Sequence, residues 1–293
     1  MKMGNIRRII YAISILLLAT TFFLNAALCE QIAWDCPECG RMGNTGNYCG
    51  NCAHPAPWMG TADNKNTEST QMDISAFQTI NNIVTFGHYE QDNDLSNGPE
   101  EIEWIVLDFD EKDHKALLIS RYGLDAKRYN EEWYGNTNTW ENCTLRKWLN
   151  DEFLKEAFDT DEQVAIIVSE VKNSASQGFV EWNSYGGNNT KDQIFLLSYV
   201  EANQYFGVER NIQNIEARVA PTAYSIAQGA GKSGKSETVD GEAAGWWWLR
   251  SPGSLQRTAA DVNADGSLGS LDVRSGGGVV RPAIWLNLES DIF

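Results

Sequence analysis

The sequence has few basic residues for its length. Among its 293 residues, 23 are Lys or Arg and 40 are Asp or Glu, which gives a formal net charge of -17 at pH 7. Such a chain repels the phosphates of nucleic acids and the headgroups of anionic membranes. The composition therefore argues against both as main partners, and membrane contact is expected only through the N-terminal segment.

Histidine and cysteine are scarce where catalysis would use them. The three histidines, His54, His88 and His114, are scattered, and none lies in the HExxH spacing of a metalloprotease. No cysteine follows Cys143, which has no histidine near it in the sequence, so we expect a buried apolar role for it. Acidic pairs are too numerous to identify a general acid and base. The sequence therefore predicts a non-catalytic protein.

The N-terminal residues 1–29 have the composition of a targeting segment. Lys2, Arg7 and Arg8 precede an apolar run from Ile9 to about Leu24, and small residues follow. This order is typical of a secretory signal peptide, although the length of the run also fits an uncleaved membrane anchor. Either interpretation places the rest of the chain outside the cytoplasm.

Residues 34–54 contain two CxxC pairs. Each pair presents two thiolates in a geometry that suits half of a tetrahedral zinc site, as in zinc ribbons. The predicted ligands are Cys36, Cys39, Cys49 and Cys52. Four thiolates leave no open coordination position, so the zinc would be structural. In an oxidising compartment the same cysteines can instead form two disulfides. Either arrangement would cross-link a segment that is too short to build a hydrophobic core of its own.

The remaining chain reads as a polar linker, residues 55–80, followed by one α+β domain, residues 81–293. Leu145, Trp148 and Leu149 have helical spacing, and Ser198 with Glu201 forms a capping box for a second helix. Strands are expected over 82–90, 101–110, 115–123, 245–251, 259–268, 271–273 and 278–288, and helices over 144–158, 198–207 and 222–229. Strands at both ends of the domain predict that the two ends share one sheet.

Three consecutive tryptophans lie in the stretch GWWWLRSPG, residues 245–253. On a strand, Trp246, Trp248 and Arg250 share one face, and Trp247 and Leu249 take the other. A strand covered on both faces explains the run, and we expect at least two of the three rings in the core. The alternative, a sugar-stacking platform, requires exposed rings.

Several segments carry a family resemblance. FGHYEQDND, EWIVLD, TLRKWLND, FLLSYVEAN, RVAPTAYS, GWWWLRSPG and VRPAIW resemble bacterial domain of unknown function 6273, over residues 83–293. The C-terminal part is also similar to variable proteins of diversity-generating retroelements, which share the C-type-lectin-like fold with formylglycine-generating enzymes. The resemblance implies a C-type-lectin-like domain with two to three helices, in which a fixed framework holds a varied surface. Those enzymes use cysteines near the C-terminus, and none is present here, so their activity is not implied.

The polar residues near the C-terminus form a candidate ligand-binding face. Apolar and polar residues alternate over 260–263 and 271–274, and Asp265-Gly266 supplies a hairpin turn. The predicted face comprises Ser254, Gln256, Arg257, Asp261, Asn263, Ser270, Asp272 and Arg274, and the predicted scaffold Trp246, Trp247, Trp248, Arg250, Arg281 and Trp285. The alternative is an ordinary solvated hairpin. Arg250 and Arg281 are expected either to pair with carboxylates inside the fold or to be solvated.

These observations predict an exported or membrane-tethered protein that binds an extracellular ligand, such as a glycan or a surface protein. The alternatives are a structural envelope protein and a hydrolase or transferase acting on the cell envelope. GAGKSGKS, residues 229–236, matches the phosphate-loop spacing. However, it lacks the preceding strand and following helix that nucleotide binding requires, so no nucleotide is expected.

Overall fold

The computed structural model describes residue 42 and residues 73–132, 138–233 and 237–293. The predicted targeting segment and the four zinc-ribbon cysteines lie outside these residues. Contacts divide the chain into the units Met1–Thr70 and Gln71–Phe293, and the fold described below belongs to the second.

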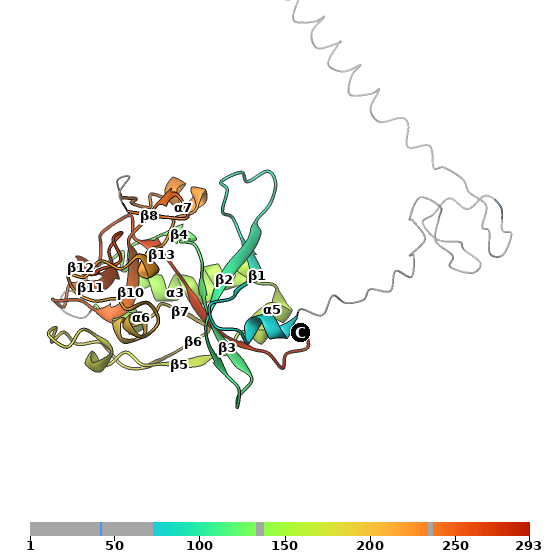
Figure 1. Ribbon diagram of the computed structural model, residues 1–293, viewed down its shortest axis with the longest axis horizontal. Coiled ribbons are helices and arrows are strands. Elements are labelled where there is room, and N and C mark those ends of the chain that lie inside the picture. The colour runs from blue at the N-terminus through green and yellow to red at the C-terminus, as the bar shows by residue number, and fades with distance from the viewer. Residues whose placement is uncertain (1–41, 43–72, 133–137, 234–236) are drawn as a thin grey trace, which may run out of the picture. The chain divides into compact units, whose positions relative to one another are not determined.

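The first sheet joins the two ends of this unit (Figure 1). Its order is β1-β2-β3-β14-β7, and all neighbouring strands are antiparallel. The strands are β1 (Ile83–Tyr89), β2 (Glu100–Asp110), β3 (Lys115–Ser120), β14 (Ala283–Asn287) and β7 (Ile194–Phe195). The predicted N-terminal meander is therefore confirmed, as is the prediction that both ends share one sheet.

The second sheet carries the tryptophan run. Its order is β12-β11-β10-β13-β4, with β10 and β13 parallel and the other pairs antiparallel. The strands are β12 (Leu268–Asp272), β11 (Thr258–Val262), β10 (Trp247–Pro252), β13 (Val279–Val280) and β4 (Asp125–Ala126). The strand predicted over 278–288 is split, because the chain passes from one sheet to the other at Arg281 and Pro282. Two ribbons complete the β-structure, β5 (Ser169–Val171) with β6 (Thr190–Asp192) and β8 (Thr238–Val239) with β9 (Glu242–Ala243).

The three predicted helices are present. Residues 144–158 form α3 (Thr144–Trp148), a π-helical turn η3 (Leu149–Phe153) and α4 (Leu154–Ala157). Helix α6 (Tyr199–Phe206) begins with the predicted capping box and ends at Gly207, whose φ of 61° favours glycine. The others are α7 (Ala223–Ala227), α5 (Thr160–Ala165), α2 (Ile74–Phe77) and the 3₁₀ turns η2 (Trp140–Asn142), η4 (Ala175–Gln177) and η5 (Ile215–Ala217).

Helix α2 lies before residue 81, where the domain is expected to begin. It lies within the segment expected to be linker, yet Phe77 is buried and its ring packs edge-on against Phe293, with centroids 5.2 Å apart. An apolar contact between the two ends of the unit extends the packed fold to before residue 81.

The tryptophan run is mostly core, as predicted. Trp247 and Trp248 are fully buried and Trp246 is half-buried. Trp247 packs against Phe206 of α6, whereas the ring of Trp248 lies 4.8 Å from that of Trp246 on the other face. Both buried indoles donate hydrogen bonds of 3.0 Å, to the backbone oxygens of Ala217 and Lys127. Strand β10 is therefore covered on both faces.

The unit is thus a mixed α+β fold with several sheets and few, short helices. No helix in the described part of the chain is both long and apolar enough to span a membrane.

Candidate functional site

The structure does not bring the predicted ligand-binding residues onto one exposed face. Ser254, Arg257 and Arg274 are exposed, whereas four of the others are half-buried: Gln256, Asn263, Ser270 and Asp272. Asp272 is occupied by an ion pair with Arg274, at 3.1 Å.

Asp261 contradicts the prediction most clearly, because it is fully buried. Strand β11 is an inner strand, and Asp261 lies between Trp248 of β10 and Gly269 of β12. A Cβ atom at Gly269 would lie 2.6 Å from Oδ2 of Asp261, so the carboxylate occupies the space that the glycine leaves. Neither carboxylate oxygen has a hydrogen-bond partner, and burial raises the pKa of Asp261 to about 7.

Other members of the predicted face hold the loops together. The amide of Gln256 accepts a bond from the backbone N–H of Tyr185 and donates to the backbone oxygens of Tyr185 and Asn138. Ser270 donates to Thr258 at 2.9 Å, and Asn263 donates to Ser267 at 3.1 Å. These groups are engaged internally, which leaves little of the predicted face free for a ligand.

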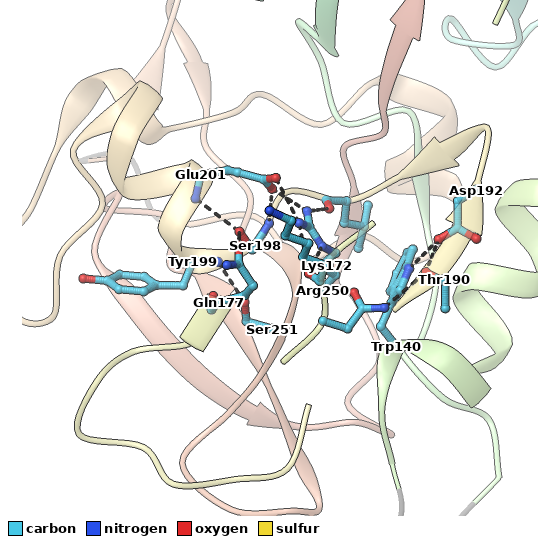
Figure 2. A network of polar contacts seen from close by, with 12 residues as sticks. Trp140, Lys172, Gln177, Thr190, Asp192, Ser198, Tyr199, Glu201, Arg250 and Ser251 are labelled. Carbon is cyan, nitrogen blue, oxygen red and sulfur yellow. Dashed lines mark hydrogen bonds and ion pairs between the residues drawn. The ribbon is translucent and has the colours of Figure 1, made fainter. Parts of the chain in front are cut away.

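Arg250 confirms the alternative of an internal ion pair. Figure 2 shows its guanidinium directed toward Glu201 of α6, with Nη2 2.9 Å from Oε1 and Nη1 paired with Oε2. The guanidinium also donates to the backbone oxygens of Leu196, at 2.7 Å, and Lys172, at 3.3 Å. Arg250 is buried, so the pair fixes the N-terminal end of α6 to the core.

The electrostatics of Glu201 follow from this pair. Burial alone would raise its pKa, but the charge of Arg250 and hydrogen bonds from Arg250 and Ser198 outweigh burial and lower the pKa. Glu201 is therefore ionised at neutral pH, and more than a quarter of its side chain is exposed to solvent. Next to it, Ser251 accepts a bond from the backbone N–H of Tyr199 and donates to the backbone oxygen of Gln177 (Figure 2).

A hollow of about 300 Å³ opens beside the Arg250–Glu201 pair. Its lining combines apolar side chains of β5, β7 and α6 with polar groups that can accept or donate hydrogen bonds. The lining residues are Ser169, Glu170, Val171, Lys172, Gln177, Phe195, Val200, Glu201, Gln204, Arg250 and Trp285.

A second, wider hollow of about 630 Å³ lies at the end of β2 and is lined by residues 108–112 and by Trp285. Trp285 therefore belongs to both hollows, and we call the two together the Trp285 groove. Its indole is half-buried, and Nζ of Lys115 lies 5.3 Å from the ring centroid. The groove is built on one face of the first sheet, where Trp285 lies opposite Leu117.

Of the residues that line the groove, only Arg250 and Trp285 were predicted from the sequence to belong to a site, and both were predicted as scaffold residues. The capping box identified Glu201 as a helix residue without a role in a site. Phe195, Lys172 and Gln204 carry no local signal, because elements far apart in the chain bring them to Trp285.

Arg281 fits neither expectation. It is buried, yet no carboxylate pairs with it among the described residues. Its guanidinium lies 4.9 and 5.0 Å from the ring centroids of Phe206 and Trp247, and Nε donates to the backbone oxygen of Ser120 at 3.0 Å. Burial lowers the pKa of Arg281 to about 9, so the charge persists at neutral pH and is balanced by the aromatic faces.

Cys143 has the predicted core role. It is fully buried, and burial raises the pKa of its thiol to about 12, which removes it as a nucleophile. His88 and His114 are exposed.

Comparison with known proteins identifies a family. The family described as "Domain of unknown function (DUF6273)" matches residues 113–288, which include the whole lining of the first hollow but, of the second hollow, only Trp285. No curated protein and no solved structure matches the chain.

Proposed function

The chain belongs to the family described as domain of unknown function (DUF6273), and we propose that it is an exported, non-catalytic recognition protein that binds a glycan in the Trp285 groove. One observation carries the proposal: a half-buried tryptophan lines two hollows, and one of these hollows also contains a carboxylate that is fixed by an internal ion pair.

The chemistry of the groove suits a neutral sugar chain. The apolar face of an indole can cover the C–H face of a sugar ring, and the carboxylate and amide groups around it can bond to hydroxyls. Glu201 and Gln204 supply such groups on α6, and Lys172 supplies a donor. The second hollow adds Asp108, Asp110 and Glu111, so the groove disfavours a polyanionic ligand.

Binding without catalysis is favoured by the state of Glu201. A general acid must hold a proton near neutral pH, and Glu201 is ionised and occupied by Arg250. This weighs against Glu201 as the general acid of a cell-envelope hydrolase or transferase. A structural envelope protein is the other alternative, and it needs no hollow with fixed polar groups.

The wider proposal keeps the sequence predictions. It comprises export by residues 1–29, a C-type-lectin-like scaffold for residues 81–293, and a structural zinc bound by Cys36, Cys39, Cys49 and Cys52. Its support is the order of the N-terminal residues, the resemblance of the C-terminal segments and the spacing of the cysteines.

The zinc has its own test. Protein purified without chelators should contain about one zinc per chain by elemental analysis, because two CxxC pairs complete one tetrahedral site. A chain without zinc, in which all four thiols resist alkylation until a reductant is added, would establish two disulfides instead.

The glycan is tested by screening the full chain against an array of cell-envelope and host polysaccharides and then titrating the best ligand. Trp285→Ala should weaken binding roughly tenfold or more, since a stacked aromatic ring contributes about 1.5 kcal/mol. Trp182→Ala is the matched control, because Trp182 is also half-buried but packs on Phe179 outside the groove. Equal affinities for the two variants would contradict the assignment of the binding site to the groove. No binding to any saccharide would contradict the proposal that the ligand is a glycan.

A further inference from the structure

Three carboxylates converge at the connection between β1 and β2, which Figure 1 shows as a long loop. Glu90 follows the last residue of β1, Asp92 lies in the loop, and Glu100 begins β2. Each offers one oxygen, and these oxygens all lie within 4.8 Å of one another. The cluster lies outside the Trp285 groove and before the residues that match the family.

Glu90 indicates that this cluster is more than an acidic surface. Glu90 is only 7% exposed, and its buried Oε1 accepts no hydrogen bond. Among the ion pairs of the described residues, none joins a Lys or Arg to Glu90, Asp92 or Glu100. Burying an unpaired carboxylate beside two others is costly unless a cation or a proton accompanies it.

The other two carboxylates are held in place by the loop itself. Oε2 of Glu100 accepts from the backbone N–H groups of Gln91, at 2.6 Å, and Asp92, at 3.3 Å. The oxygens of Asp92 accept from the backbone N–H of Asp94, at 2.7 Å, and from Nδ2 of Asn97, at 2.8 Å. The oxygens are thus positioned before any ion arrives, which reduces the entropy lost on binding.

We propose that Glu90, Asp92 and Glu100 bind a calcium ion. Calcium takes carboxylate oxygens at about 2.3–2.6 Å, so two of its ligands lie at most about 5 Å apart, which the 4.8 Å limit satisfies. Three carboxylates match a hard divalent cation, whereas zinc would favour nitrogen and sulfur ligands. The ion would supply the positive charge that Glu90 lacks and would link the end of β1 to the start of β2.

The test is a calcium titration of the full chain. Thermal unfolding in CaCl₂ should occur at least about 5 °C higher than in EGTA when calcium is at 100 times its dissociation constant. Isothermal titration calorimetry should give one ion bound per chain at this site. Glu90→Gln should abolish both responses, and it should fold well without calcium because it removes a buried charge.

Glu101→Gln is the matched control, since Glu101 is exposed, adjacent in sequence and not part of the cluster; it should keep the full response. If Glu90→Gln fails to fold, Asp92→Asn takes its place. A wild-type chain that neither binds calcium nor is stabilised by it overturns the proposal, and so does a Glu90 variant that responds like wild type. Glycan binding measured in EGTA is a separate readout, so failure of the groove and failure of this site are distinguishable.

Discussion

Replacing Arg250 by Met should lower the free energy of unfolding by about 3–5 kcal/mol, the range found when one partner of a buried ion pair is removed. The change leaves Glu201 without its counter-charge and leaves the backbone oxygens of Leu196 and Lys172 without donors. Met retains much of the aliphatic volume, so the loss reports the polar network more than a cavity. Urea unfolding at pH 7 measures it.

Arg274→Met is the control for Arg250→Met. Arg274 pairs with Asp272 on the surface, so we expect a change of at most about 0.5 kcal/mol. Adding Glu201→Gln to Arg250→Met should recover part of the loss, because the double variant no longer contains an unpaired carboxylate. Equal losses for the two arginine variants would mean that the network seen in Figure 2 does not anchor α6.

Replacing Asp261 by Asn should stabilise the protein by about 2 kcal/mol at pH 8. The unfolded chain ionises Asp261 near 3.8, whereas burial raises the pKa in the fold to about 7. The folded state therefore holds a proton that the unfolded state has lost, and stability falls as pH rises from about 4 to 7. Above pH 7 the raised pKa of Asp261 costs the wild type about 4 kcal/mol of stability. Asn removes this cost, but its buried amide lacks hydrogen-bond partners, which cancels part of the gain.

Urea unfolding at pH 4.5 and pH 8 tests this sign. The wild type should lose more stability than Asp261→Asn between the two pH values, and at pH 4.5 Asp261→Asn should be the less stable protein by about 1 kcal/mol, because little of the penalty on Asp261 has developed there. Asp272→Asn is the control, because the pKa of Asp272 is lowered by hydrogen bonds from Arg274, so this change should not stabilise the protein at pH 8. A pH dependence unchanged by Asp261→Asn would show that Asp261 is solvated or paired in solution.

Local patterns predicted most of the regular structure. The strands of the N-terminal meander are β-branched and aromatic-rich runs separated by turn residues, and the Ser198–Glu201 box with Gly207 marks both ends of α6. The strand split at Arg281–Pro282 was missed, because continuous β-branched and aromatic residues do not reveal a change of sheet. Short ribbons such as β5–β6 were missed because three residues carry no measurable period.

The site was predicted less well, and for a physical reason. Alternation placed Asp261 on a solvent face, but β11 is flanked by β10 and β12 and covered on both faces, which only the strand order reveals. The groove depends on contacts between residues far apart in sequence, such as Arg250 with Glu201 and Lys172. Composition and spacing describe neighbours along the chain, so they identified Trp285 as scaffold and not as the centre of a groove.

The measurement that tests the glycan site most directly is a two-dimensional ¹⁵N NMR titration that follows the indole N–H signals of the 11 tryptophans. Trp285→Phe assigns one signal, and the best saccharide from the array is then added to the wild type. The glycan-binding proposal predicts that the Trp285 signal shifts in proportion to occupancy while those of buried Trp247 and Trp248 stay in place. Saturation of the chain with saccharide without a shift at Trp285 would contradict it.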